Sequence, residues 1–239
     1  MEARIQQIRQ ELARAAEQAG RNPASVTLVA ATKTQSHQTI RRAIAAGIRV
    51  CGENRVQEMK AHLSQNAYEG AQLHFIGHLQ TNKVRDVVGQ VSLIHSVSSL
   101  RLLEAIQRQA RKLELVQDIL LEVQLVPEAA KEGFPPAELD HVATLLRRMP
   151  NVRLRGLMCM PPAPRAPGEN RVYFSQLRGM AVDINRKMKD NETDSLFLSM
   201  GMSQDFADAI AEGATHIRIG TALFGPRPPM QPSERSQLP

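Results

Sequence analysis

Aromatic residues are scarce in this sequence. Its 239 residues include no tryptophan and only two tyrosines, and Phe, Trp and Tyr together make up 3%. Proteins that read nucleic acids by stacking bases usually carry more aromatic rings than this. The composition therefore argues against a nucleic-acid partner, although the formal net charge is +6. The charge suits an anionic ligand, but by itself it does not distinguish a phosphate from a nucleic acid or a membrane surface.

Cysteines and long apolar runs are equally scarce. Cys51 and Cys159 are too few and too far apart for a zinc knuckle, a CxxC redox pair or a disulfide framework. Charged or amide residues interrupt every apolar stretch before it reaches the ~20 residues that a membrane-spanning helix needs. The segment MEARIQQIRQELARA mixes acids with bases, which is not typical of a targeting peptide. We expect a cytoplasmic protein with no metal site and no membrane partner.

Short apolar runs alternate with segments of helical periodicity along the chain. Eight runs rich in Val, Ile and Leu are Val26–Ala31, Ile48–Cys51, Leu73–Ile76, Leu93–His95, Val116–Leu125, Val152–Met158, Ser195–Leu198 and His216–Ile219. Strands that alternate with helices indicate a parallel sheet. Eight such units in a chain near ~250 residues predict a single closed (β/α)8 TIM-type barrel. A doubly wound open sheet is the alternative, although no GxGxxG motif follows the first run.

The rest of the chain adds little to this barrel. Ile5, Ile8 and Leu12 share one helical face, so an extra N-terminal helix is expected before the first strand. Five of the 14 residues from Pro226 onward are proline, which predicts a disordered tail. We therefore expect one domain over residues 1–225 and a Pro-rich tail over residues 226–239.

The first candidate for chemistry along the chain is Lys33. It follows the first run on the same pleat face as Val29 and Ala31, so its side chain is expected to point into the barrel. Burial among apolar neighbours lowers the pKa of an ammonium group, and such lysines form Schiff bases with carbonyl compounds. A lysine that extends into solvent at a strand end is the alternative.

Other polar residues end the remaining runs, where the functional residues of such barrels gather. Asn54 can cap the next helix or bind a ligand oxygen, and His78 offers a ring or a titratable nitrogen. Ser96 and Met158 lie at the ends of the fourth and sixth runs. His74 and His78 do not form a metal pair, because their spacing falls on a strand and a loop rather than on one helical face.

The segment LSMGMSQDFADAIAEGATHIRIGTALFG carries the clearest motif. Ser199 and Ser203 follow the seventh run, and Gly220 and Thr221 follow the eighth, so two hydroxyl and glycine loops predict a phosphate cup. Arg218 is expected to point inward, where its fixed charge would keep a ring nitrogen unprotonated; a structural ion pair is the alternative. A reactive lysine, a phosphate cup and an inward arginine together indicate a site for pyridoxal 5′-phosphate (PLP).

Five segments, VAATKTQ, CGENRVQE, LHFIGHLQTNK, LRGLMCMPP and the last motif, resemble in this order the pyridoxal-phosphate homeostasis protein family. That single-domain family is similar to the N-terminal barrel of alanine racemase. The resemblance implies a fold-type-III barrel in which Lys33 holds PLP as an internal aldimine. It places the remaining cofactor contacts at Asn54, His78, Ser96, Met158, Ser199, Ser203, Arg218, Gly220 and Thr221. Arg55 and His78 stand where many relatives have Tyr and Pro, and the segment around Lys131 also departs from the family.

The resemblance implies a carrier or regulator of intracellular PLP without catalytic turnover, and PLP-dependent apo-enzymes are candidate partners. A racemase needs a second acid–base group opposite the lysine, which alanine racemases supply as a tyrosine from an additional domain. This chain has no room for that domain, and Tyr68 and Tyr173 are expected to lie away from the strand ends. We therefore expect a monomer without enzymatic activity. A PLP-dependent racemase or decarboxylase at the same site is the alternative.

Overall fold

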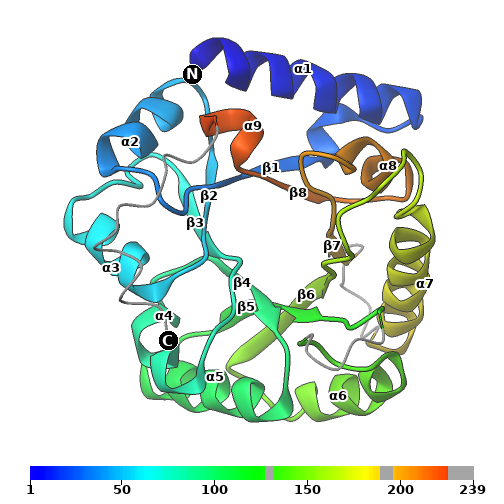
Figure 1. Cartoon of the computed structure of the whole chain (residues 1–239). Coiled ribbons are helices and arrows are strands. Elements are labelled where there is room, and N and C mark those ends of the chain that lie inside the picture. The colour runs from blue at the N-terminus through cyan, green and yellow to red at the C-terminus, as the bar shows by residue number, and fades with distance from the viewer. Residues whose placement is uncertain (127–131, 189–195, 226–239) are drawn as a thin grey trace.

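The computed structural model describes residues 1–126, 132–188 and 196–225, and within them eight parallel strands form a closed barrel (Figure 1). The strands are β1 (Thr27–Ala31), β2 (Val50–Glu53), β3 (Gln72–Phe75), β4 (Leu93–Val97), β5 (Gln117–Glu122), β6 (Val152–Met158), β7 (Phe197–Ser199) and β8 (His216–Ile219). Each strand pairs with the next, and β8 closes the barrel by pairing with β1. The predicted (β/α)8 barrel is thus confirmed. The expected Pro-rich tail and Lys131 lie outside the described residues.

Helices surround the barrel on its outer side (Figure 1). They are α1 (Glu2–Gln18), α2 (His37–Ala45), α3 (Val56–Ser64), α4 (Val84–Val87), α5 (Leu100–Lys112), α6 (Leu139–Leu146), α7 (Arg171–Met188), α8 (Phe206–Ala211) and α9 (Thr221–Phe224), with 3-10 turns η1 (Pro23–Ser25), η2 (Thr81–Lys83) and η3 (Pro136–Glu138). The expected N-terminal helix is α1, which buries Ile5, Ile8 and Leu12. α9 has only four residues, and α1 lies beside it, outside β1 and β8 (Figure 1).

Five strands, β2, β3, β4, β5 and β7, end at residues other than those expected. β1 stops at Ala31, as expected, and the chain then turns at Lys33 and Thr34, whose φ is 64°. β2 extends to Glu53, beyond the predicted Cys51. β5 stops at Glu122, three residues before the end of its apolar run at Leu125, so a carboxylate ends this strand.

The centre of the barrel interior is polar. Two small apolar clusters lie inside it, formed by Val29, Ala31, Val50 and Ile76 and by Leu93, Leu120 and Met158. The main apolar core instead fills the space between the sheet and the helices. Between the two inner clusters, the buried polar residues are His74, His95, Ser199, His216 and Arg218. This polar centre connects the two ends of the barrel.

Candidate functional site

A cavity of about 310 Å3, here called the mouth cavity, opens where β2 to β6 end. Four of the predicted cofactor residues line it, namely Asn54, His78, Ser96 and Met158. The other lining residues are Ile76, Gly77, Glu122, Val123, Gln124, Leu125, Val126, Glu132, Cys159, Met160 and Pro161. The structure therefore brings together residues that are more than 100 positions apart in the sequence, because parallel strands end at the same edge of the barrel.

The ends of β2 and β3 lie unusually close together at this cavity. A Cβ atom on Gly77 would lie 2.2 Å from the backbone oxygen of Asn54, so only glycine allows this approach. The Ser96 hydroxyl donates to the Gly77 carbonyl from the neighbouring strand. Asn54 keeps its side-chain Oδ1 buried and without a hydrogen-bond partner among the described residues. This oxygen is available to a donor on a ligand in the mouth cavity.

Two carboxylates on the wall of the cavity were not predicted. Glu122 ends β5, and burial raises the pKa of its carboxyl group to about 6, with a further increase from the neighbouring Glu132. Glu132 hydrogen-bonds the exposed His78 ring across the cavity rim. Glu122 lies inside the long apolar run Val116–Leu125 and was therefore not expected at a strand end. With β5 ending at Glu122, the rule that functional residues lie at strand ends would have identified it.

Arg218 is the most deeply buried cation of the site, with 5% of its surface exposed. Its Nη1 donates to Ser199 Oγ at 2.6 Å and its Nη2 to the carbonyl of Cys159 at 3.0 Å. Both acceptors are neutral, and no ion pair with Arg218 occurs among the described residues. The inward orientation is therefore as expected, whereas the alternative of a structural ion pair is not observed in this part of the chain. Because Cys159 also lines the mouth cavity, Arg218 lies directly beside that cavity.

The remaining predicted residues surround the same end of the barrel without lining the mouth cavity. Lys33 is half-buried in the turn after β1, and Ser203 is exposed in the loop after β7. Gly220 is half-buried and Thr221 exposed at the start of α9, directly after β8. Since β7, β8 and β1 are consecutive in the closed barrel, these three turns are neighbours.

Tyr68 lies in a turn outside the strands, as expected, but its side chain reaches the last residue of β2. The Tyr68 hydroxyl donates to Glu53 Oε1 at 2.8 Å, and Glu53 is the last residue of β2. His62 Nδ1 and the Thr32 hydroxyl also contact this oxygen, at 3.1 Å and 2.6 Å. Because Glu53 points away from the barrel interior, however, Tyr68 lies on the helix side of the sheet. Tyr173 lies on α7, as expected for a helical residue.

The described residues contain neither a metal-binding cluster nor a membrane-spanning helix. No group of three or more His, Cys, Asp or Glu side chains in this part of the chain is arranged to hold a metal ion. No helix among the described residues is long and apolar enough to cross a membrane.

Comparison with known proteins places this architecture in a family. Residues 4–228 match the family model described as "Alanine racemase, N-terminal domain". The chain is 40% identical over 224 residues to the pyridoxal phosphate homeostasis protein of Aquifex aeolicus, covering 94% of this chain and 97% of the relative. It is 39% identical over 228 residues to the protein of the same name from Escherichia coli, with 93% and 95% covered.

A solved structure agrees with these sequence relatives. PipY of Synechococcus elongatus, determined with PLP bound, superposes with a TM-score of 0.77 at 38% identity, covering 90% of this chain and 100% of PipY. Diaminopimelate decarboxylase of Helicobacter pylori shares only the fold, at 13% identity and a TM-score of 0.72. The chain therefore belongs to the pyridoxal phosphate homeostasis protein family, whose barrel is that of the alanine racemase N-terminal domain.

Proposed function

We propose that this protein binds pyridoxal 5′-phosphate at the mouth of the barrel and takes part in PLP homeostasis as a carrier or regulator. The observation that supports this most is the burial of the Arg218 guanidinium, which makes no close ion pair among the described residues, although the Glu122 and Asp205 carboxylates interact with it from a greater distance. Burying a charge without a close counter-ion is costly, and an electron-rich ligand atom at this position offsets the cost. The buried Oδ1 of Asn54, which also lacks a partner in the described part of the chain, is consistent with a ligand in the same place.

Each residue in this proposal has a distinct task. When bound, PLP supplies an electrophilic aldehyde attached to an electron-withdrawing ring. Lys33 would provide the amine that holds the aldehyde carbon, and Ser203, Gly220 and Thr221 would hold the phosphate. Ser199, also expected as a phosphate contact, has its hydroxyl bonded to Arg218 and His95 and would instead position Arg218. Arg218 would face the ring nitrogen and keep it unprotonated, because a second positive charge close to the guanidinium is unfavourable. Met158, buried at the cavity wall, would exclude water from one side of the ring.

The assay follows visible absorbance as PLP is added to the purified protein, with borohydride reduction and mass spectrometry to locate the attached lysine. We expect a visible band in the native protein and a modified peptide containing Lys33. Lys33→Ala should abolish both signals, whereas Lys112→Ala, an exposed lysine on α5, should leave them unchanged. A native protein that takes up no PLP, or attachment at another lysine, would contradict the proposal.

A second candidate function is PLP-dependent turnover of amino acids, and Glu122 is the observation that favours it. In the closed eight-stranded barrel, β5 lies opposite β1. Glu122 ends β5 and Lys33 follows β1, so the two residues are on opposite sides of the mouth. With a pKa of about 6, its carboxyl group can exchange a proton near neutral pH. The assay follows the loss of an added amino acid or of its chirality. Turnover that disappears in Glu122→Gln, while PLP binding is retained, would establish this activity in place of the non-catalytic proposal.

We further propose that the protein acts in the cytoplasm as a monomer and that PLP-dependent apo-enzymes are its partners. Cys51 and Cys159 are both buried and unpaired, which is consistent with a reducing compartment. Light scattering of the purified protein tests the monomer, and transfer of PLP from the loaded protein to an added apo-enzyme tests the partner. Transfer no faster than release of PLP into buffer would contradict a direct partnership.

A further inference from the structure

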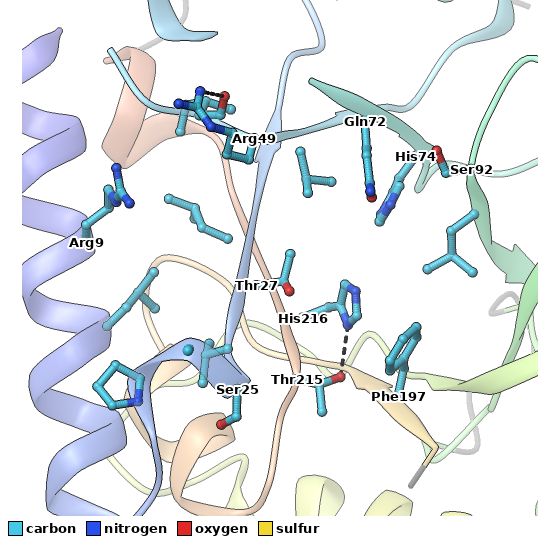
Figure 2. Close-up of a pocket in the computed structure, with 18 of the residues that line it drawn as sticks. Arg9, Ser25, Thr27, Arg49, Gln72, His74, Ser92, Phe197, Thr215 and His216 are labelled. Carbon is cyan, nitrogen blue, oxygen red and sulfur yellow. Dashed lines mark hydrogen bonds between the residues drawn. The ribbon is translucent and has the colours of Figure 1, made fainter. Parts of the chain in front are cut away.

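A second cavity, here called the floor cavity, lies at the opposite end of the barrel, where the strands begin (Figure 2). Its volume is about 1050 Å3, which is large enough for a small organic molecule. It is bounded on one side by α1 and on the other by the first residues of the strands. The polar side chains that matter here are Arg9, Arg49, His74, Asp118, Arg155 and His216. None of these residues belongs to the proposed PLP site.

The lining of the floor cavity carries an excess of positive charge. Its only carboxylate among the described residues is Asp118, which already accepts two hydrogen bonds from Arg153, at 2.6 and 3.0 Å. Arg155 lies 3.7 Å from the same carboxylate, and Arg49 donates only to backbone carbonyls. Arg9 extends from α1 (Figure 2) and has no ion pair or hydrogen bond with any described residue. An anionic group would balance this charge.

A buried histidine also faces the floor cavity with one nitrogen unpartnered. His74 has 3% of its surface exposed, and its Nε2 makes no hydrogen bond within the described part of the chain. Its other nitrogen, Nδ1, lies 3.0 Å from His95 Nε2, and His95 Nδ1 lies 2.8 Å from Ser199 Oγ. Ser199 Oγ in turn accepts from Arg218 Nη1 at 2.6 Å. A hydrogen-bonded chain therefore runs through the barrel from Arg218 to the floor cavity.

The donor and acceptor groups of these four side chains determine which atom donates in each hydrogen bond of the series. Arg218 can only donate, so Ser199 Oγ accepts from it and directs its own proton to the remaining contact, His95 Nδ1. The opposite direction would leave the buried Ser199 hydroxyl proton without an acceptor among the described residues, which is unfavourable. His95 then donates from Nε2 to His74 Nδ1, and His74 carries its single proton on Nε2. The floor cavity is thus offered an N–H donor.

Both histidines in this chain stay neutral at physiological pH, because burial lowers the pKa of His74 to about 3 and that of His95 well below its ordinary value. The second histidine of the cavity, His216, is also neutral, with a pKa lowered to about 4 by burial. Its Nδ1 lies 2.9 Å from Thr215 Oγ1 (Figure 2), and its ring centroid is 5.9 Å from that of His74. The described residues contain no group suited to a metal ion, so these rings are better suited to hydrogen bonding.

We infer that the floor cavity is a binding site for a small molecule that carries a phosphate or carboxylate group. The oxyanion accepts the hydrogen bond from His74 Nε2, while Arg9 and Arg155 add positive charge to the lining of the cavity. The remaining volume accommodates the rest of the molecule. This site is separate from the PLP site, and the inference does not depend on PLP binding.

Nitrogen NMR of protein labelled with 15N-histidine tests both parts of the inference. The spectrum distinguishes protonated from unprotonated ring nitrogens, and we expect the proton of His74 on Nε2. Inorganic phosphate and acetate are then titrated at constant ionic strength, with and without PLP. We expect saturable shifts at His74 and His216 for at least one anion in both cases. The stronger of the two anions identifies the group that the site prefers.

Two arginine variants provide the control. Arg155→Gln should weaken the binding of the preferred anion about three- to ten-fold, because Arg155 lies over the Phe197 ring, which packs on His216 beside His74, and supplies positive charge close to the anion. Arg14→Gln, exposed on α1 and not part of the cavity, should leave the affinity unchanged. A His74 proton on Nδ1, the absence of saturable shifts at both histidines, or equal effects of the two variants would overturn the inference. Failure of PLP binding alone would leave these readouts intact.

Discussion

Glu122→Gln is expected to stabilise the protein at neutral and alkaline pH. The ordinary pKa of a glutamate, 4.5 in its unfolded reference, rises to about 6 in the fold because burial disfavours the charged carboxylate. The folded state therefore binds the proton more tightly than the unfolded state. Ionised Glu122 destabilises the fold above pH 6 by about 2 kcal/mol, and this penalty disappears as the pH falls below 4.5.

Glutamine has the shape of the protonated carboxyl group and cannot ionise, so the variant should avoid this penalty. The free energy of unfolding, measured by urea denaturation between about pH 4.5 and pH 8, should be about 2 kcal/mol higher for the variant at the alkaline end. The two proteins should converge at the acidic end. Glu69→Gln, at an exposed glutamate, should follow the native curve throughout. Parallel curves for the native protein and Glu122→Gln would refute the reasoning.

Three further substitutions are tested by urea or thermal denaturation, two at the ends of β2 and β3 and one on the outer helix α7. Glu53→Leu removes the acceptor of Tyr68 and its two neighbours, so we expect a loss of about 3 kcal/mol, and a loss below ~1 kcal/mol would contradict the buried network. Gly77→Ala places a Cβ 2.2 Å from the Asn54 backbone oxygen and should cost at least about 1–3 kcal/mol. Gly179→Ala, in the open on α7, should instead stabilise the protein by about 0.5–1 kcal/mol; similar effects of the two alanines would refute the steric argument.

Most of the fold follows from local patterns in the sequence. The alternation of short apolar runs with helical segments predicts eight strands, and the face formed by Ile5, Ile8 and Leu12 predicts α1. Strand ends are harder to place, because an apolar run continues wherever the chain stays buried. Leu125 extends the fifth run past the point at which β5 stops pairing, and for that reason Glu122 was missed.

Contacts between distant strands could not be predicted from such patterns. Tyr68 reaches Glu53 only because the loop before β3 packs against the end of β2 on the outer side of the sheet. The chain of hydrogen bonds from Arg218 to His74 needs β3, β4, β7 and β8 to face one another inside a closed barrel. No local signal distinguishes these histidines from ordinary core residues.

The sequence by itself determined the class of fold, the extra helix and the set of polar residues at the strand ends, because periodicity and strand-end chemistry are local properties. Only the tertiary structure decided which of these residues meet. Closure of the barrel buried Arg218 beside neutral acceptors, placed Glu122 on the wall of the mouth cavity and left His74 facing a second cavity at the floor. The physical reason is that burial and partner choice, which set charge, pKa and proton direction, depend on neighbours that are far apart along the chain.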